Sequence, residues 1–473
     1  MGFMEALEPI VRHLPEVPRP IRKLDLRERF LWTGLALGIY LVMSHIPLYG
    51  VKSYGGLFEQ LYFFRVIFAS KRGSLMELGI GPIVTAGLIM QILVGSKLLK
   101  IDLSKPRERA LFTGVQKLLA IIMTAVEAAA FILGGAYGYL SLESALLVLA
   151  QLVAVGVIVI LLDEMVQKGW GLGSGVSLFI LAGVSQQIAW LSLSPVGPVA
   201  DGKQLGALIA FTQTVLSGEN VLNAFNRYPY PDMTGFFTMI AVFLMVVYFE
   251  GMRIEIPVAY ARYGGLRAKI PLKFLYVSNI PIILASALFA NILFFSRVIW
   301  MNFNPDNSNP ILNLIVRFSP QGERGFTPLP GSLVYYLTPV RSISEAMTDP
   351  VHAVVYTIIL CVLSVAFAIV WVQVAGMSAR DQAENLVKAG LQVPGFRSST
   401  RVIEQVLNRY IPPLTIISGL IIGLIAAIAD MLGALGSGIG ILLSVGIIYQ
   451  YYEILARERL EETYPALSRI FGR

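Results

Sequence analysis

The chain has 473 residues and a net charge of +7; 56% of the residues are hydrophobic, 14% are charged, and the mean hydropathy is +0.69. A soluble domain carries about 25% charged residues, so this composition excludes a surface that faces water on all sides. The apolar residues form long blocks with the charges in the gaps between them, which predicts an all-α integral membrane protein.

The first segment, residues 1–29, contains six Lys and Arg residues and no uninterrupted apolar core. We therefore expect an amphipathic cytoplasmic segment and no cleavable signal peptide. Ten apolar blocks follow, each close to the roughly 20 residues that a helix needs to cross a bilayer. They are residues 30–49, 75–95, 111–133, 145–162, 172–192, 234–249, 274–296, 351–372, 411–429 and 438–455. We expect an N-terminal half at 30–233, a C-terminal half at 234–455 and a tail at 456–473.

An even number of spans places both termini on one side of the membrane. The termini and the gaps on their side, 96–110, 163–171, 250–273 and 374–410, hold 26 of the 37 Lys and Arg residues. The gaps on the opposite side hold 10, although they are longer in total. Because positive residues accumulate on the cytoplasmic side, both termini are predicted to be cytoplasmic.

A short apolar segment, LFEQLYFFRVIF at residues 57–68, lies in the first gap on the outer side. It is too short to span a bilayer and rather long for a bare loop. Two interpretations are open: a re-entrant helix that fills a cavity from outside, or an interfacial helix on the outer leaflet. Its candidate packing residues are Leu57, Phe58, Leu61, Phe64 and Ile67.

Charges within the spans are rare. Lys117 lies near the cytoplasmic end of its span and can extend to the interface. Glu127 lies deeper on the same helix, where a carboxylate marks a functional site or a protonated acid that bonds a neighbouring helix. The sequence has no P-loop motif, and its three histidines lack the spacing of metal ligands. We therefore expect no enzyme activity, no cofactor and no metal, and a driving force that a partner or a gradient supplies.

Two cytoplasmic gaps, 250–273 and 374–410, each hold five basic residues. Either these residues obey the orientation rule and contact anionic lipid, or they dock an acidic partner such as ribosomal RNA. The candidate binding residues are Arg253, Arg262, Arg267, Lys269, Arg397 and Arg401.

Two pairs of segments are similar at a spacing of five spans. GLGSGVSLFILAG at 171–183 matches ALGSGIGILLSVG at 434–446, and IGPIVTA at 80–86 matches NIPIILA at 279–285. Because five is odd, the second half must cross the membrane in the opposite direction. The pattern indicates an inverted repeat with a functional path between the halves; the alternative is the general recurrence of small residues in membrane helices.

Four longer motifs are more specific. They are GIGPIVTAG at 79–87, GLGSGVSLFILAGVSQ from Gly171, PLKFLYVSNIPIILASALFAN from Pro271, and RYIPPL at 409–414. In this order they closely resemble archaeal SecY and its counterpart in the endoplasmic reticulum, over essentially the whole chain. The resemblance implies the channel-forming subunit of a Sec protein translocase in the cell membrane. Such a channel passes unfolded secretory polypeptides across the membrane and releases transmembrane segments into lipid through a lateral gate.

The resemblance also implies roles for particular residues. The apolar pore ring falls on Ile80, Val84, Val176, Ile180, Ile283 and Leu443. The lateral gate lies between spans two and three on one side and seven and eight on the other, with a polar cluster at Thr85, Glu127 and Asn291. Residues 57–68 correspond to the plug beneath the ring, and the two basic gaps to ribosome-binding loops. Val176 stands where the family often has Ile, and Glu127 where it often has Gln.

The pattern of the residues agrees with this ring. Ile80 with Val84, and Val176 with Ile180, are i,i+4 pairs that share one helix face. The repeat equates Ile180 with Leu443, so these two ring positions are related by the pseudo-symmetry.

The implied partners are a SecE-type subunit and a SecG- or beta-type subunit in a heterotrimer, the ribosome with its RNA, the nascent polypeptide with its signal sequence, and membrane lipid. On the residues alone, two other functions compete. A secondary transporter of a small solute shares the inverted repeat but needs polar ligands at the midplane, where this chain places Ile, Val and Leu. A structural scaffold needs neither the repeat nor the short apolar segment.

Overall fold

The ten apolar blocks form ten long helices in the computed structural model of the chain. The structure describes residues 3–22, 24–51, 73–95, 98–99, 101, 105–133, 137, 140–199, 201–227, 229–260, 267–277, 280–319, 327–388, 391–392 and 399–463. In these ranges the ten helices are α2 (Leu26–His45), α4 (Gly81–Gly95), α5 (Pro106–Leu133), α6 (Leu142–Met165), α7 (Gly175–Leu193), α9 (Met233–Gly251), α10 (Ile280–Phe303), α14 (Pro350–Val374), α17 (Ile411–Met431) and α18 (Gly438–Thr463). Eight are long and apolar enough to cross a membrane, and α2 and the shorter α4 complete the set. The predicted ten-helix membrane fold is confirmed.

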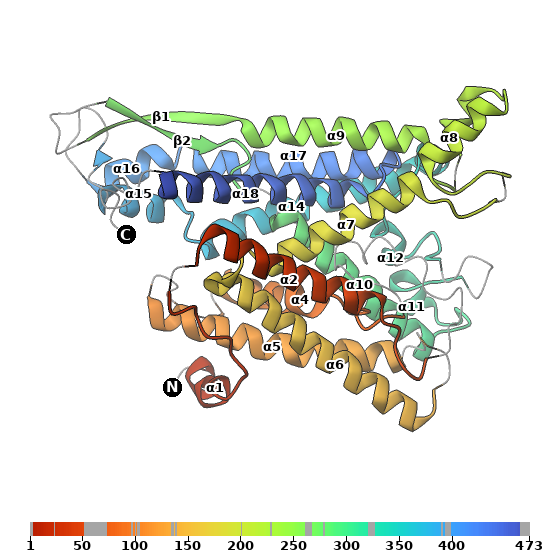
Figure 1. Ribbon diagram of the computed structural model, residues 1–473, viewed down its shortest axis with the longest axis horizontal. Helices are drawn as coiled ribbons and strands as arrows, with labels where there is room; N and C mark the ends of the chain where they lie inside the picture. Colours follow the sequence, from red (N-terminus) through yellow and green to blue (C-terminus); the bar gives the residue numbers. More distant parts are fainter. Residues whose placement is uncertain are drawn as a thin grey trace.

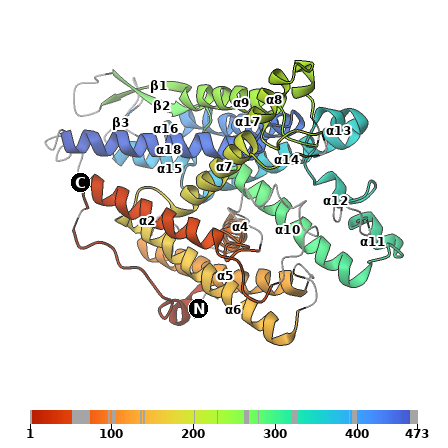
Figure 2. The ribbon, with the colours of Figure 1, turned by 45° about the vertical axis from the view of Figure 1, so that its right-hand side comes forward.

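The long helices form two groups that meet along one interface. In Figure 1, α5 and α6 lie on one side and α9, α17 and α18 on the other, with α7 and α10 between them. Figure 2 shows α4 between α2 and α10. Across the interface, α7 packs against α18, and α4 packs against both α10 and α14. This is the two-half arrangement that the inverted repeat predicts.

Shorter elements lie at the two ends of the bundle. The helices are α1 (Phe3–Val11), η2 (Val166–Trp170), α8 (Ala207–Leu216), η3 (Val221–Ala224), α11 (Pro310–Ile315), α12 (Leu333–Tyr336), α13 (Ile343–Thr348), α15 (Ala379–Lys388) and α16 (Thr400–Leu407). The strands are β1 (Arg253–Tyr260), β2 (Arg267–Lys273) and β3 (Leu391–Gln392). In Figure 1 the strands, α15, α16 and α1 lie at one end, and α8, α11 and α12 at the other.

The strands join the two basic loops. β1 and β2 form an antiparallel hairpin within 250–273, and β3 adds to β1 in the order β2-β1-β3. The pairing of Tyr260 with Leu391 connects the first loop to the second. The sequence analysis predicted no sheet at this position, and β3 gives no local signal because it has only two residues and its pairing is long-range.

The N-terminal segment lies against the ends of α5 and α6. The Trp170 indole Nε1 donates to the carbonyl of Pro18 at 2.7 Å. Lys117, expected to extend toward the interface, forms an ion pair with Glu164 at 2.6 Å. The Lys117 ammonium also donates to the carbonyl of Pro15. This bond and the Trp170 bond hold the start of the chain beside the first half.

The second span is shorter than its apolar block, because residues 75–80 are not helical. Gly79 has φ 56°, a left-handed conformation that favours glycine. The Leu75 amide donates to the Ile46 carbonyl at 2.9 Å, and the Leu48 amide donates to the Gly73 carbonyl at 2.8 Å. The chain before α4 is therefore tied to the end of α2.

Small residues allow α14 and α17 to pack closely. A Cβ placed on Gly419 would lie 2.9 Å from the Cα of Val365, and one on Gly423 would lie 3.0 Å from the Cα of Cys361. These glycines are four residues apart, the spacing that brings membrane helices into backbone contact. Since α14 also contacts α4, this packing supports the interface between the halves.

Candidate pore and lateral gate

The six expected ring residues come from both halves and belong to one apolar cluster at the centre of the bundle. Ile80, Ile180 and Leu443 are fully buried, and Val84 is 8% exposed. The other two ring residues are partly buried against the same cluster. Apolar side chains of α4, α7, α10 and α18, with the residue that precedes α4, therefore contribute to one cluster, which also includes residues of α2, α14 and α17.

The contacts between α7 and α18 show that these helices are antiparallel. Near the start of α18, a Cβ on Gly440 would lie 3.4 Å from Val184 of α7. Farther along α18, the Tyr451 hydroxyl donates to the carbonyl of Leu172, just before α7, at 3.1 Å. The ring residues of both helices lie between these two contacts, so they occupy a similar depth.

The three expected gate residues form a chain of hydrogen bonds. The Asn291 Nδ2 atom on α10 donates to the Thr85 Oγ1 atom on α4 at 3.0 Å. The Thr85 hydroxyl in turn donates to Glu127 Oε1 on α5 at 3.1 Å. Thr85 is 4% exposed and Glu127 7%. Because the Thr85 hydroxyl has one proton to donate, it connects an amide donor to a carboxyl acceptor across the gate.

Two further contacts join the two sides of the expected gate through other pairs of helices. Phe131 of α5 stacks on Phe294 of α10 with a ring centroid distance of 4.7 Å. A Cβ on Gly95 of α4 would lie 2.6 Å from Cγ1 of Val370 on α14. Together with the polar cluster, these contacts bring the two sides of the gate into contact at several points. Nothing in the sequence singled out these four residues, since each contact joins spans far apart in the chain.

Two family models match the sequence. One, described as SecY, matches residues 74–452, and the other, described as the plug domain of Sec61p, matches residues 39–73. The chain belongs to the SecY family. It is thus a multi-pass membrane protein with the two-half architecture described above.

Full-length relatives support this assignment. The protein translocase subunit SecY of Pyrococcus furiosus is 43% identical over 490 residues, which cover 100% of both chains. A structure described as a protein conducting channel has a TM-score of 0.82 and 41% identity, and covers 97% of this chain and 99% of that one. Sec61 in the canine ribosome-channel complex from the endoplasmic reticulum has a TM-score of 0.80 and 41% identity, with the same coverage.

The short apolar segment, 57–68, lies within the range that matches the plug domain of Sec61p. The segment and its five candidate residues lie outside the residues that the structure describes. Arg262 and Arg397 of the basic loops also lie outside them.

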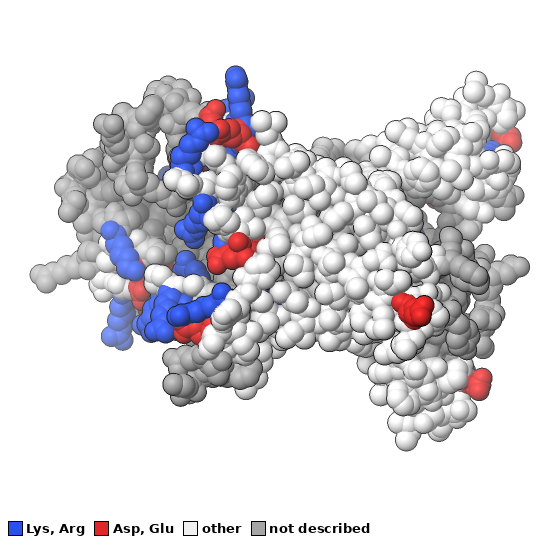
Figure 3. Space-filling model, turned by 60° about the horizontal axis from the view of Figure 1, so that its bottom comes forward, with Lys and Arg blue, Asp and Glu red and all other residues white. Residues whose placement is uncertain are grey.

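The other loop residues lie at the end of the molecule that carries the sheet, where Figure 3 shows Lys and Arg side chains gathered. Arg253 donates to Glu453 at 3.1 Å and to the Tyr449 hydroxyl at 2.9 Å. Lys269 pairs with Glu255. Arg401 is exposed on α16, and Arg267 begins β2. Part of the predicted docking surface is therefore neutralised within the chain, whereas Arg401 is presented to solvent.

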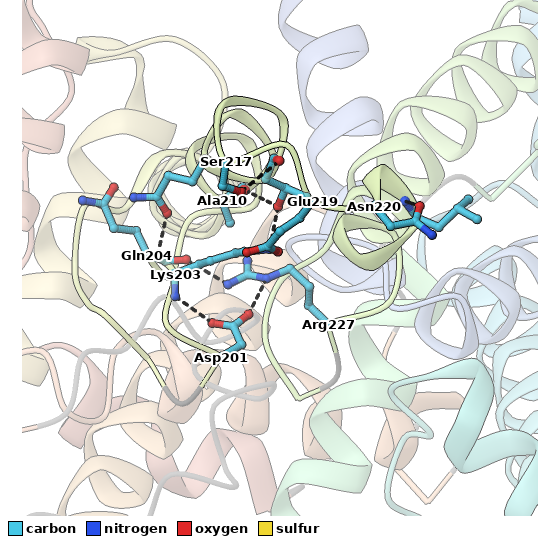
Figure 4. Close-up of polar contacts among 11 residues, drawn as sticks. Asp201, Lys203, Gln204, Ala210, Ser217, Glu219, Asn220 and Arg227 are labelled. Carbon is cyan, nitrogen blue, oxygen red and sulfur yellow. Dashed lines mark hydrogen bonds and ion pairs between the residues drawn. The ribbon is translucent and has the colours of Figure 1, made fainter.

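One segment, residues 194–232, links the two halves between α7 and α9. Its centre is Arg227, whose side chain is 3% exposed. Its guanidinium donates to Asp201 at 2.8 Å and to the carbonyl of Gln204 at 2.9 Å (Figure 4). It also donates to the carbonyl of Pro231 at 3.0 Å. One buried cation thus folds a long link into a compact unit.

Proposed function

We propose that this chain is the central channel-forming subunit of a Sec protein translocase. Unfolded secretory polypeptides cross the membrane between its two halves, and transmembrane segments leave into lipid between α4–α5 and α10–α14. The observation that most directly supports this proposal is the apolar cluster where the halves meet, which contains all six ring residues. Full-length similarity to proteins described as translocase subunits and protein-conducting channels supports it independently.

Apolar branched side chains suit a channel whose cargo has no fixed sequence. Specific polar contacts would retain some polypeptides, whereas Ile, Val and Leu side chains can change rotamer around any segment. They also offer no polar group that could bind an ion. At rest, such a constriction excludes water and resists ions without an exact steric seal. A secondary transporter of a small solute would instead need convergent polar ligands at this depth.

The proposed gate mechanism follows from the polar cluster. Asn291 on α10 can bond Thr85 on α4 only while these two helices are adjacent, so this bond stabilises the closed gate, and the bond from Thr85 to Glu127 holds the Thr85 hydroxyl on its side of the gate. A signal sequence that enters between α4 and α10 must break the bond from Asn291 to Thr85. We propose that this bond sets part of the free energy that a signal sequence must overcome.

We further propose the cell membrane as the location, with both termini in the cytoplasm. The gathering of Lys and Arg at the sheet end supports this orientation. The proposed partners are SecE-type and SecG- or beta-type subunits, the ribosome through its RNA, the nascent chain and its signal sequence, and lipid. The similarity to canine Sec61 in a ribosome-channel complex supports the ribosome as a partner. We propose no catalytic activity for the chain itself.

Reconstitution tests the function and the ring together. The chain, with its two small partners in liposomes, should protect a signal-bearing polypeptide from external protease, and a polypeptide without a signal should stay accessible.

The double substitution Ile180→Asn and Leu443→Asn should raise resting ion conductance in planar bilayers several-fold, because the amides hydrate the constriction. The matched control, Ile180→Leu with Leu443→Ile, should behave as the parent. Ion-coupled solute uptake without polypeptide protection would overturn the proposed function. A polar variant that conducts no more than the parent would overturn the ring.

A further inference from the structure

A buried carboxylate near the end of α6 caps the helix that follows. Asp163 Oδ1 accepts from the Val176 amide at 2.9 Å and from the Ser174 hydroxyl at 3.4 Å. Its other oxygen, Oδ2, accepts from the Gln167 side-chain amide at 2.7 Å. Asp163 is 8% exposed. It therefore satisfies an amide at the start of α7 that has no acceptor within the helix.

The second half repeats this arrangement. Asp430, near the end of α17, accepts from the Gly438 amide at the start of α18 at 2.6 Å through Oδ1. It is 5% exposed. α6 with α7, and α17 with α18, are span pairs four–five and nine–ten, so the two carboxylates act at corresponding helix pairs of the two halves.

The two aspartates make the same kind of contact in the folded chain, but they do not occupy matching positions when the two repeat sequences are aligned. Asp163 lies twelve residues before Gly175, whereas Asp430 lies eight residues before Gly438. The four additional residues correspond to about one helical turn, and the short helix η2 lies in this longer connection. Aligning the two motifs therefore does not pair the two aspartates, and only the folded chain shows that they act alike.

Each cap acts where two backbones are in contact. A Cβ on Gly175 would lie 2.7 Å from the Cα of Asp163, and one on Gly438 would lie 2.2 Å from the carbonyl oxygen of Ala426. The start of each helix is thus pressed against the preceding helix, and the carboxylate bond fixes its position along that helix. A negative group at a helix N-terminus also interacts favourably with the helix dipole.

Both capped helices carry ring residues close to the cap. Ile180 and Leu443 each lie five residues beyond the glycine that begins their helix, little more than one turn away. We propose that Asp163 and Asp430 are positioning residues of the pore ring: each fixes the depth of its helix so that the two ring side chains meet. This inference rests on the proposed function, because it concerns the ring of a channel.

Alanine substitutions test the inference, with a third cap as the control. Asp163→Ala and Asp430→Ala should each raise resting conductance in planar bilayers several-fold, because the helix start loses its anchor and the ring loosens. Asp163→Asn and Asp430→Asn keep an acceptor oxygen and should stay near the parent. Asp232→Ala removes a similar bond, from the Gly235 amide at 2.7 Å, but at the start of α9, which carries no ring residue. Its conductance should match that of the parent.

Complex assembly, measured by gel filtration and retention of the two small subunits, separates positioning from misfolding. If an alanine variant does not assemble, the test uses the Asp→Glu variant at the same position. The added methylene displaces the carboxylate from the amide, so this variant should still raise conductance. Parental conductance in assembled variants of both aspartates would overturn the inference, as would an increase in Asp232→Ala. If the double variant Ile180→Asn with Leu443→Asn raises conductance and the cap variants do not, the positioning role of the two aspartates is wrong. The proposed ring is then still supported.

Discussion

Individual residues in the ring and in the gate meet opposite requirements. A side chain of the proposed ring must exclude water without binding its cargo, and we propose that the buried Ile180 and Leu443 do this through shape alone. A gate side chain must hold the helices together when the channel is idle and release them when a signal arrives. Thr85 suits the second task, because a single hydroxyl both accepts from Asn291 and donates to Glu127. Its removal affects two bonds at once.

Thr85→Val keeps the shape of the side chain and removes the hydroxyl. In the closed gate the substitution leaves the Glu127 oxygen without this donor and Asn291 without this acceptor. A buried polar group that loses its partner costs about 1–3 kcal/mol. Opening separates Asn291 on α10 from Thr85 on α4, so the Asn291 amide that has lost its acceptor destabilises only the closed state. Thr85 and Glu127 lie on the same side of the gate, so the loss of their bond affects both states. We expect the gate equilibrium to shift toward the open state by about 5- to 150-fold.

Export of precursors with defective signal sequences measures this shift. Thr85→Val should export them more efficiently than the parent, with little change for strong signals. Thr85→Ser, which keeps the hydroxyl, is the control and should resemble the parent. Equal export of defective precursors by the valine variant and the parent would remove Thr85 from the gate.

At the scale of elements, the link between the halves is a folded unit with its own polar core. Arg227 occupies its centre, and Lys203 pairs with Glu219 at 2.6 Å (Figure 4). Partial burial raises the pKa of Asp201, but hydrogen bonds from Arg227 and from the Lys203 amide outweigh it, so its pKa lies below the ordinary 3.8. A carboxyl whose pKa is lowered on folding stabilises the folded form above its unfolded pKa. This contribution is lost as the pH falls through the folded value.

Acid should therefore loosen this link in a way that depends on Asp201. Hydrogen exchange of the amides in residues 194–232 should be slow and constant from pH 7 to about pH 4, after correction for the intrinsic rate. It should accelerate below the ordinary pKa of 3.8. Asp201→Asn cannot titrate and should show faster exchange at pH 7 with little further change in acid. The same acid response in the asparagine variant would assign it to other groups.

The helices and strands also show which features of the fold could be predicted from the sequence. The ten spans follow from apolar length, and the antiparallel pairing of α7 with α18 follows from the five-span repeat. The shortened start of α4 and the strand β3 were not predictable, because each depends on backbone pairing with a distant segment. The ring and gate positions came from family resemblance. The stacking of Phe131 on Phe294, which joins distant spans, has no local signal.

The whole molecule is asymmetric in charge from one end to the other. The end with the sheet, α15 and α16 carries the predicted basic loops, which backbone pairing between β1 and β3 holds together. Arg253 and Lys269 are engaged with carboxylates of the chain, so they contribute less to an external partner than their number suggests. Arg401 is exposed at the same end. If a ribosome docks there, we expect Arg401 to contact RNA phosphate.

Arg401→Gln removes one charge from this end without disturbing a buried contact. Each phosphate contact releases condensed counterions, so its loss should weaken ribosome binding most at low salt. The slope of log affinity against log salt should fall by about 1. Arg317→Gln is the matched control, since Arg317 is also exposed but follows α11 at the opposite end. Co-sedimentation of the liposome-embedded complex with archaeal ribosomes over a salt series measures both. Equal slopes for Arg401→Gln and the parent would mean that Arg401 serves only the orientation of the chain in the membrane. A reduced slope for Arg317→Gln would contradict a docking surface at the sheet end.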